Sequence, residues 1–210
     1  ADSRRLAIAE ESGREIVTMV HADALPSKVI TGHALENAIR VDMAIGGSTN
    51  AVIHLLALAG RLRLPLTLED FDRLSRSTPC IVNLKPSGDR YMEDLYYAGG
   101  IPAVMHEIAD LLHLDAVAVN GKSLGENIRQ AEVFDHEVIR RRDRPLFSQG
   151  GTVVLRGNLA PNGAVLKQTA ASEHLLDHRG HAVVFRDRAD MYARIDSADL
   201  PVTADSVLVS

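Results

Sequence analysis

The chain has 210 residues, of which 46% are hydrophobic and 24% charged, and its formal net charge is −5. This composition is typical of a globular protein with a buried core, while the negative charge and the 4% share of aromatic residues argue against a nucleic-acid partner. Charges interrupt every apolar run before the roughly 18 residues of a membrane span, so no membrane partner is expected. The single cysteine, Cys80, excludes an internal disulfide and fits a cytoplasmic location.

Residues 2–76 are expected to be mostly helical. Apolar residues recur at helical spacing over 2–21, and a second helix is predicted over 33–45, ending at Gly46-Gly47. A third helix, from about 50 to 62, is apolar on nearly all sides, which predicts that it lies buried within a domain. Thr67-Leu-Glu-Asp70 has the form of a capping box and predicts a short helix that ends near Arg76.

Strands and helices are predicted to alternate from residue 80 to residue 131. Cys80-Ile-Val-Asn-Leu84 and Ala116-Val-Ala-Val119 are short apolar runs that we interpret as buried strands. Helical segments are expected between and after them, and these are residues 92–97, 103–112 and 123–131. The alternation predicts an α/β fold with a mostly parallel sheet flanked by helices.

The composition changes after residue 131, where Arg140-Arg-Arg-Asp-Arg144 forms a basic connector. We interpret this run as a solvated linker rather than a phosphate site. We therefore predict a domain boundary at about residue 145. Residues 1–145 would form the α/β domain, and residues 146–210 the beginning of a β-rich domain.

The segment 146–210 contains the remaining predicted strands. Residues 151–157 and 164–167 flank a loop with Pro and Asn-Gly, as in a β-hairpin. Further strands are expected at 181–185 and 206–209, with a helix beginning near Asp187. The last strand runs to the end of the chain without a closing element, so we expect this second domain to be truncated.

The turn between the second and third helices is the main candidate for a binding site. Gly46-Gly47 frees the backbone to adopt positive φ or to approach a ligand closely. Ser48, Thr49 and Asn50 can cap the next helix, whose N-terminus also suits a carboxylate or phosphate. The alternative is an ordinary glycine break followed by a good N-cap, and the spacing matches no nucleotide-binding motif.

Other candidate side chains have competing structural explanations. Cys80 is interpreted as a small buried hydrophobe rather than a nucleophile, and His54 as a core histidine rather than a pocket residue. His174 and His178 share the i,i+4 spacing of metal ligands, but an exposed helix end is favoured. The carboxylates in Met92-Glu-Asp94 either bind a cation or act as a base, or else cap a helical turn; both alternatives stay open.

Four sequence blocks, in the same order, resemble the dihydroxy-acid dehydratase and phosphogluconate dehydratase family. They are Gly46-Gly-Ser-Thr-Asn-Ala-Val-Ile-His54, Lys85-Pro-Ser-Gly88, Tyr91-Met-Glu-Asp94 with Ala98-Gly-Gly-Ile-Pro-Ala-Val104, and Leu155-Arg-Gly-Asn-Leu-Ala-Pro-Asn-Gly-Ala-Val165. The resemblance implies a homodimeric, or larger homo-oligomeric, hydro-lyase that removes water from a 2,3-dihydroxy acid to give a 2-keto acid. It also implies an α/β N-terminal domain followed by a barrel-like C-terminal domain.

The resemblance further implies an iron–sulfur cluster held by three cysteines and a nearby magnesium ion. The iron would act as a Lewis acid on the 3-hydroxyl, while magnesium would stabilise the enolate formed at C2. The family's cluster cysteines and part of its magnesium ligands would precede Ala1, and its catalytic serine would follow Ser210. We therefore expect the middle of a longer enzyme, which by itself is inactive and binds neither cofactor, so no catalytic or metal residue is assigned.

Two functional hypotheses follow. In the first, the chain is part of a dehydratase in which Ser48, Thr49 and Asn50 bind a small hydroxy-acid substrate. The run from His181 to Asp196 resembles the sugar-acid branch of the family, which favours an aldonate. In the second, the chain is a standalone α/β module that binds a small anion without catalysis.

Overall fold

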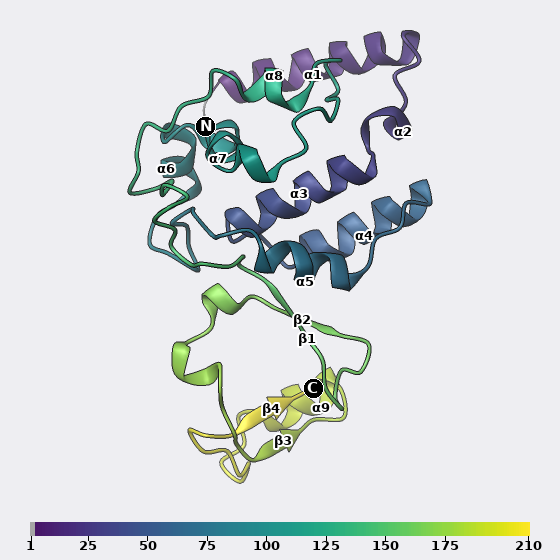
Figure 1. Ribbon diagram of the computed structural model, residues 1–210. Helices are drawn as coiled ribbons and strands as arrows, with labels where there is room; N and C mark the ends of the chain where they lie inside the picture. Colours follow the sequence, from purple (N-terminus) through teal and green to yellow (C-terminus); the bar gives the residue numbers. More distant parts are fainter. Residues whose placement is uncertain (1–2) are drawn as a thin grey trace. The chain divides into compact units, whose positions relative to one another are not determined.

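The computed structural model describes residues 3–210 and is shown in Figure 1. Asp2, where the first helix was expected to begin, lies outside the described residues. The chain divides into two compact units, one that ends at Ala170 and one from Ala171 to Ser210. The predicted boundary at about residue 145 concerns the domains of a longer protein and stays a prediction.

The first unit is built mainly from helices, and most of them lie where the apolar spacing predicts. They are α1 (Arg4–His21), α2 (Pro26–Val29), α3 (Gly32–Ala44), α4 (Asn50–Leu62), α5 (Leu68–Arg76), α6 (Met92–Tyr97), α7 (Gly100–Glu107) and α8 (Leu124–Ile128). The predicted capping box of α5 is confirmed, because the Thr67 N–H donates to Asp70 Oδ2 at 3.0 Å. The helix predicted over 103–112 divides into α7 and a 3₁₀ turn at Ala109–Leu111.

Two apolar clusters form the core of this unit. Helices α3, α4 and α5 lie side by side (Figure 1) and enclose the first cluster. It contains Ile39, Met43, Val52, Phe71 and Leu74. The second cluster joins the end of α3 to the segment 81–84 and to α6 and α7. Its buried members are Ala44, Ile81, Val82, Leu84, Leu95, Ala98, Ala103, Val104, Ile108, Leu112, Val138 and Ile139. The end of α3 therefore contributes to both clusters.

The predicted mostly parallel sheet is not formed within residues 3–210. Cys80 and Val82 make isolated antiparallel bridges to Phe147 and Ile139, and the run at 116–119 makes one bridge, between Val117 and Ser123. A short apolar run is equally compatible with a buried strand and with another buried segment. Here the run 80–84 is buried against the end of α3 and the loop 139–147. The fold is mixed α/β, with small sheets of two strands each.

The expected burial of α4 is also wrong for the described residues. Only Val52 and Ala59 of this helix are buried, while Ile53 is 66% exposed and Leu58 is 43% exposed. Leu55 and Leu56 are half-buried against the first cluster, so the helix packs with one stripe only. Helix α1 contributes no buried residue at all. Neither helix, nor any other in residues 3–210, combines the length and apolar character needed to cross a bilayer.

The strand predictions after residue 150 are confirmed. In the first unit, β1 (Val153–Leu155) pairs antiparallel with β2 (Ala164–Leu166), as expected for the hairpin. In the second unit, β3 (Ala182–Val184) and β4 (Val207–Val209) pair in parallel, with α9 (Arg188–Arg194) between them in sequence. Asp187 caps α9, since its Oδ1 accepts the Asp190 N–H at 2.8 Å.

We predict that Phe71→Ala destabilises the protein by about 3–5 kcal/mol, because Phe71 is 1% exposed and its removal leaves a cavity between α3, α4 and α5. The free energy of unfolding, measured by denaturant titration, checks this. Leu159→Ala is the matched control, since Leu159 is 85% exposed and its loss should change stability by less than about 0.5 kcal/mol. Equal effects of the two substitutions would contradict the assignment of the core.

Candidate functional site

The turn that follows α3 has a backbone shape that depends on its glycines. Gly46 has φ of +59°, a conformation that L side chains rarely adopt. A Cβ atom on Gly46 would also lie 3.3 Å from Cys80 Sγ and 3.4 Å from Ser87 Oγ. The Gly47 N–H donates to the Asp42 carbonyl at 2.8 Å and so closes the end of the helix. The turn is therefore in close contact with the segment that carries Ser87.

Asp42 fills the space beside Gly47. A Cβ atom on Gly47 would lie 2.0 Å from Asp42 Oδ1, so only glycine fits here without displacing the carboxylate. The other carboxylate oxygen, Oδ2, is buried and has no hydrogen-bond partner within residues 3–210. Burial raises the pKa of Asp42 to about 6, and the nearby positive charge of Lys167 opposes this only in part. The site therefore contains a carboxyl group that gains a proton in mildly acidic solution.

Ser87 and Thr169 bring two further segments to the same turn. Their hydroxyl groups share a hydrogen bond of 2.8 Å. Thr169 Oγ1 also donates to the Gly151 carbonyl at 3.3 Å, and the Gly151 N–H donates to the Met43 carbonyl at 3.2 Å. Segments that are far apart in the sequence thus meet around Gly46.

The predicted site residues Ser48, Thr49 and Asn50 lie at the start of α4 and differ in their contacts. Ser48 Oγ accepts the Asn50 N–H at 3.2 Å, which is a structural role. Thr49 is the N-cap residue, but its side chain makes no capping hydrogen bond. The backbone N–H groups of Ser48 and Thr49 have no acceptor within the described residues. Two amide donors and the Thr49 hydroxyl are therefore free at this helix N-terminus.

The structure also shows the surroundings of three other candidates from the sequence, Cys80, Asp94 and His54. Cys80 is fully buried, as expected, and burial raises the pKa of its thiol to about 11, so it is not a thiolate at neutral pH. Asp94 Oδ2 accepts the Tyr91 N–H at 2.7 Å, which favours the capping interpretation of the Met92-Glu-Asp94 carboxylates. His54 is exposed on α4, so its interpretation as a core histidine is wrong.

His174 and His178 belong to no group of three possible metal ligands within the described part of the chain. His174 lies in the 3₁₀ turn Glu173–Leu175, and His178 Nε2 lies 3.0 Å from the Asp205 carbonyl. Within residues 3–210, the possible metal ligands that gather in a group of three are instead His33, His113 and Asp115. Sequence reasoning did not single out this group.

Sequence reasoning also missed Asp42 and Thr169. Asp42 had a detectable signal, because it is a carboxylate in the otherwise apolar run from Val41 to Ile45 at the end of a helix. A charged residue within such a run has to be paired, neutralised or functional. Thr169 had no such signal, since only the folded chain brings it to Ser87.

The family models and the similar proteins of known name all point to one family. The model described as "Dihydroxy-acid/6-phosphogluconate dehydratase N-terminal" matches residues 1–127, and its C-terminal counterpart matches residues 137–210. An L-arabonate dehydratase of Azospirillum brasilense is 54% identical over 211 residues, and an L-arabinonate dehydratase of Rhizobium leguminosarum is 50% identical over 210 residues. Each alignment covers 99% of this chain and 36% of the relative.

A dihydroxy-acid dehydratase of Caldicellulosiruptor saccharolyticus is 46% identical over 193 residues, which cover 91% of this chain and 35% of the relative. The chain thus spans about a third of the length of the curated relatives that it matches.

We predict that Asp42 makes stability fall as the pH rises. Because its pKa is raised to about 6 in the folded protein, the proton is held more tightly there than in the unfolded chain, where the pKa is about 3.9. Its contribution is fully present below about pH 4 and is lost as the pH rises through about 6. Relative to Asp42→Asn, the wild type should lose about 2 kcal/mol between pH 4 and pH 7.

Denaturant titrations of both proteins at several pH values measure this difference. The Asn variant is the matched control, because it has nearly the same shape and cannot ionise. Parallel stability profiles for the two proteins would show that Asp42 does not carry the raised pKa.

Proposed function

The chain belongs to the dihydroxy-acid/6-phosphogluconate dehydratase family, and we propose that the protein containing it is a hydro-lyase. It would remove water from a 2,3-dihydroxy acid to give a 2-keto acid. The observation that carries this proposal is that Ser87 and Thr169, which share a hydrogen bond, meet at Gly46. Gly46 and Ser87 belong to two sequence blocks by which the chain resembles the family, and these blocks lie in one place.

We propose that the start of α4 binds polar groups of the substrate. The free N–H groups of Ser48 and Thr49 lie at the positive end of the 13-residue helix α4, an environment that stabilises a carboxylate or a polarised hydroxyl. The Thr49 hydroxyl adds a group that can both donate and accept. Asn50 supplies a side-chain amide from the first turn. Together these groups would orient the chain of a hydroxy acid.

The residues of this chain do not fit the cofactors that the family implies. A cluster held by three thiolates cannot form from one cysteine, and the thiol of Cys80 is buried with a raised pKa. Asp42 offers only one carboxylate, and the nearby positive charge of Lys167 would repel a bound cation. We therefore assign the iron–sulfur cluster and the magnesium ion to parts of the enzyme outside these residues and derive no step through them.

We also infer a fold for the longer protein. The buried runs 80–84 and 116–119 would join a larger, mostly parallel sheet, and residues 146–210 would begin a barrel-like domain. The two small sheets lie within residues 146–210 and support the second part of this inference, because a two-stranded sheet leaves edges that can accept further strands. The proposed homodimer rests on the family resemblance, and the proposed cytoplasmic location rests on the single cysteine.

A sugar acid is the substrate class that we propose. Two of the relatives are named for the dehydration of arabonate, at 54% and 50% identity, and the relative named for dihydroxy acids in general is 46% identical. A free helix N-terminus with several donors suits a substrate that carries many hydroxyl groups. The second candidate, an anion-binding module without catalysis, relies on the same free amides and would bind sugar acids without turnover.

We predict that Thr49→Ala in the whole enzyme raises KM or lowers kcat several-fold with little change in melting temperature. The physical reason is that Thr49 makes no capping bond, so its hydroxyl is available to the substrate. Steady-state kinetics and thermal unfolding measure the two effects separately. Thr49→Ser keeps the hydroxyl and should restore the kinetics.

Ser48→Ala is the structural comparison for this experiment. It removes the acceptor of the Asn50 N–H and should cost about 1 kcal/mol of stability. If Thr49→Ala leaves both kinetic constants unchanged, the turn has no role in substrate binding and the site assignment is wrong.

We predict that the whole enzyme prefers a five- or six-carbon aldonate to dihydroxy-isovalerate. Polar groups at the start of α4 would remain unpaired beside the branched apolar tail of dihydroxy-isovalerate, which penalises its transition state. Keto-acid formation from arabinonate, xylonate, gluconate and dihydroxy-isovalerate gives the comparison. A tenfold preference for dihydroxy-isovalerate, equivalent to about 1.4 kcal/mol, would overturn the assignment, and binding of aldonates without keto-acid formation would favour the non-catalytic module.

A further inference from the structure

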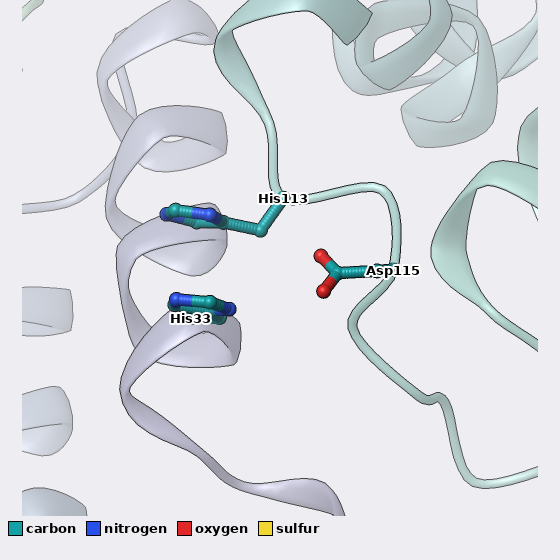
Figure 2. A group of neighbouring side chains, drawn as sticks. All are labelled: His33, His113 and Asp115. Carbon is teal, nitrogen blue, oxygen red and sulfur yellow. The ribbon is translucent and has the colours of Figure 1, made fainter.

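A second group of polar side chains lies apart from the Gly46 turn. His33 comes from the first turn of α3, while His113 and Asp115 come from the loop after the 3₁₀ turn Ala109–Leu111 (Figure 2). One ligand atom from each of the three residues lies within 4.8 Å of the other two. We propose that His33, His113 and Asp115 bind a divalent transition-metal ion, with zinc as the best-suited ion.

The types of side chain support this proposal. Two imidazoles and one carboxylate are a common ligand set for zinc, and the same set disfavours calcium and magnesium, which prefer oxygen ligands alone. The three ligands come from two segments that are about 80 residues apart in sequence, so the fold itself assembles the group.

The position of His113 is fixed by groups around it. His113 Nε2 lies 2.7 Å from Glu36 Oε2, and the pKa of Glu36 is lowered, chiefly by this hydrogen bond. Asn37 holds the backbone of His113 at both ends, because its Oδ1 accepts the His113 N–H at 2.8 Å and its Nδ2 donates to the His113 carbonyl at 2.9 Å. A carboxylate on one ring nitrogen is the usual partner of a metal-binding histidine, and it leaves Nδ1 to face the metal.

His33 is the ligand that has to move. Its ring stacks on the His113 ring, with centroids 3.9 Å apart and an angle of 2° between the planes. Nitrogen lone pairs lie in the plane of each ring, so two parallel rings cannot both point at one ion. His33 is exposed, and we infer that a side-chain rotation tilts its ring toward Asp115 when metal binds.

Space for further ligands lies beside the group. A surface pocket of about 430 Å³ is lined by His33, Asp115 and Lys28, among other residues. The Lys28 ammonium is engaged by Asp23, at 2.7 Å from its carbonyl and 3.3 Å from Oδ2. Water molecules in this pocket would complete a tetrahedral set of ligands around zinc. This site shares no residue with the proposed substrate site and does not depend on the proposed function.

Equilibrium dialysis of the whole protein against radiolabelled zinc tests the proposal. The wild type should bind one more zinc ion per polypeptide, at low zinc concentration, than His33→Asn or Asp115→Asn. His174→Asn is the matched control, because it removes a histidine outside the group, and it should bind as the wild type does. Circular dichroism and melting temperature confirm that each variant is folded.

A further variant tests the role of Glu36. Glu36→Gln keeps the shape but removes the charge, and it should weaken zinc binding about tenfold or more. Anomalous scattering from a crystal soaked in zinc should place the ion between His33, His113 and Asp115. Equal zinc binding by the wild type, His33→Asn and Asp115→Asn, all folded, would overturn the proposal and leave the stacked histidines as a purely structural contact.

Discussion

The close approach of two backbones, at Gly46 and Gly151, is the constraint on which the arrangement of the first unit depends. A Cβ atom on Gly151 would lie 2.7 Å from the Gly46 Cα, so neither segment could sit where it does if Gly151 carried a side chain. The Gly151 N–H then bonds to the Met43 carbonyl and fixes the residues before β1 to the end of α3. Thr169 is brought beside Ser87 by the same contact. The arrangement of the candidate substrate site therefore depends on the close packing of the Gly46 and Gly151 backbones.

Local interactions were predictable from the sequence, and non-local ones were not. The caps at Thr67 and Asp187 involve residues three positions apart, so their spacing alone identifies the starts of α5 and α9. The run 80–84 was correctly expected to be buried and wrongly expected to join a parallel sheet. Its partners, Phe147 and Ile139, are more than 50 residues away, and the apolar pattern carries no information about them.

The same distinction applies to the candidate sites. The Gly46-Gly47 turn could be found because glycine pairs and capping residues are visible in sequence. The sequence signal at Asp42 could not show that its pKa is raised to about 6, because this shift depends on burial that the whole unit creates. The group around His113 depends on a loop that Asn37 holds against α3, a contact across 76 residues. The exposure of α4 was missed for a related reason. An apolar helix surface shows that burial would be favourable, but it does not show which segment would cover the helix.

The lack of buried residues in α1 determines how readily this helix unfolds locally. It has no buried residue in the described chain, and most of the stability of a helix in a protein comes from packing of its apolar face. The free energy that separates its folded and frayed states is therefore small, whereas α3, with six buried residues, opens only with the core. Amide protons of α1 would exchange with solvent far sooner than those of α3, and a protease would cut α1 first. Slow exchange in α1 would thus report directly that another surface has covered it.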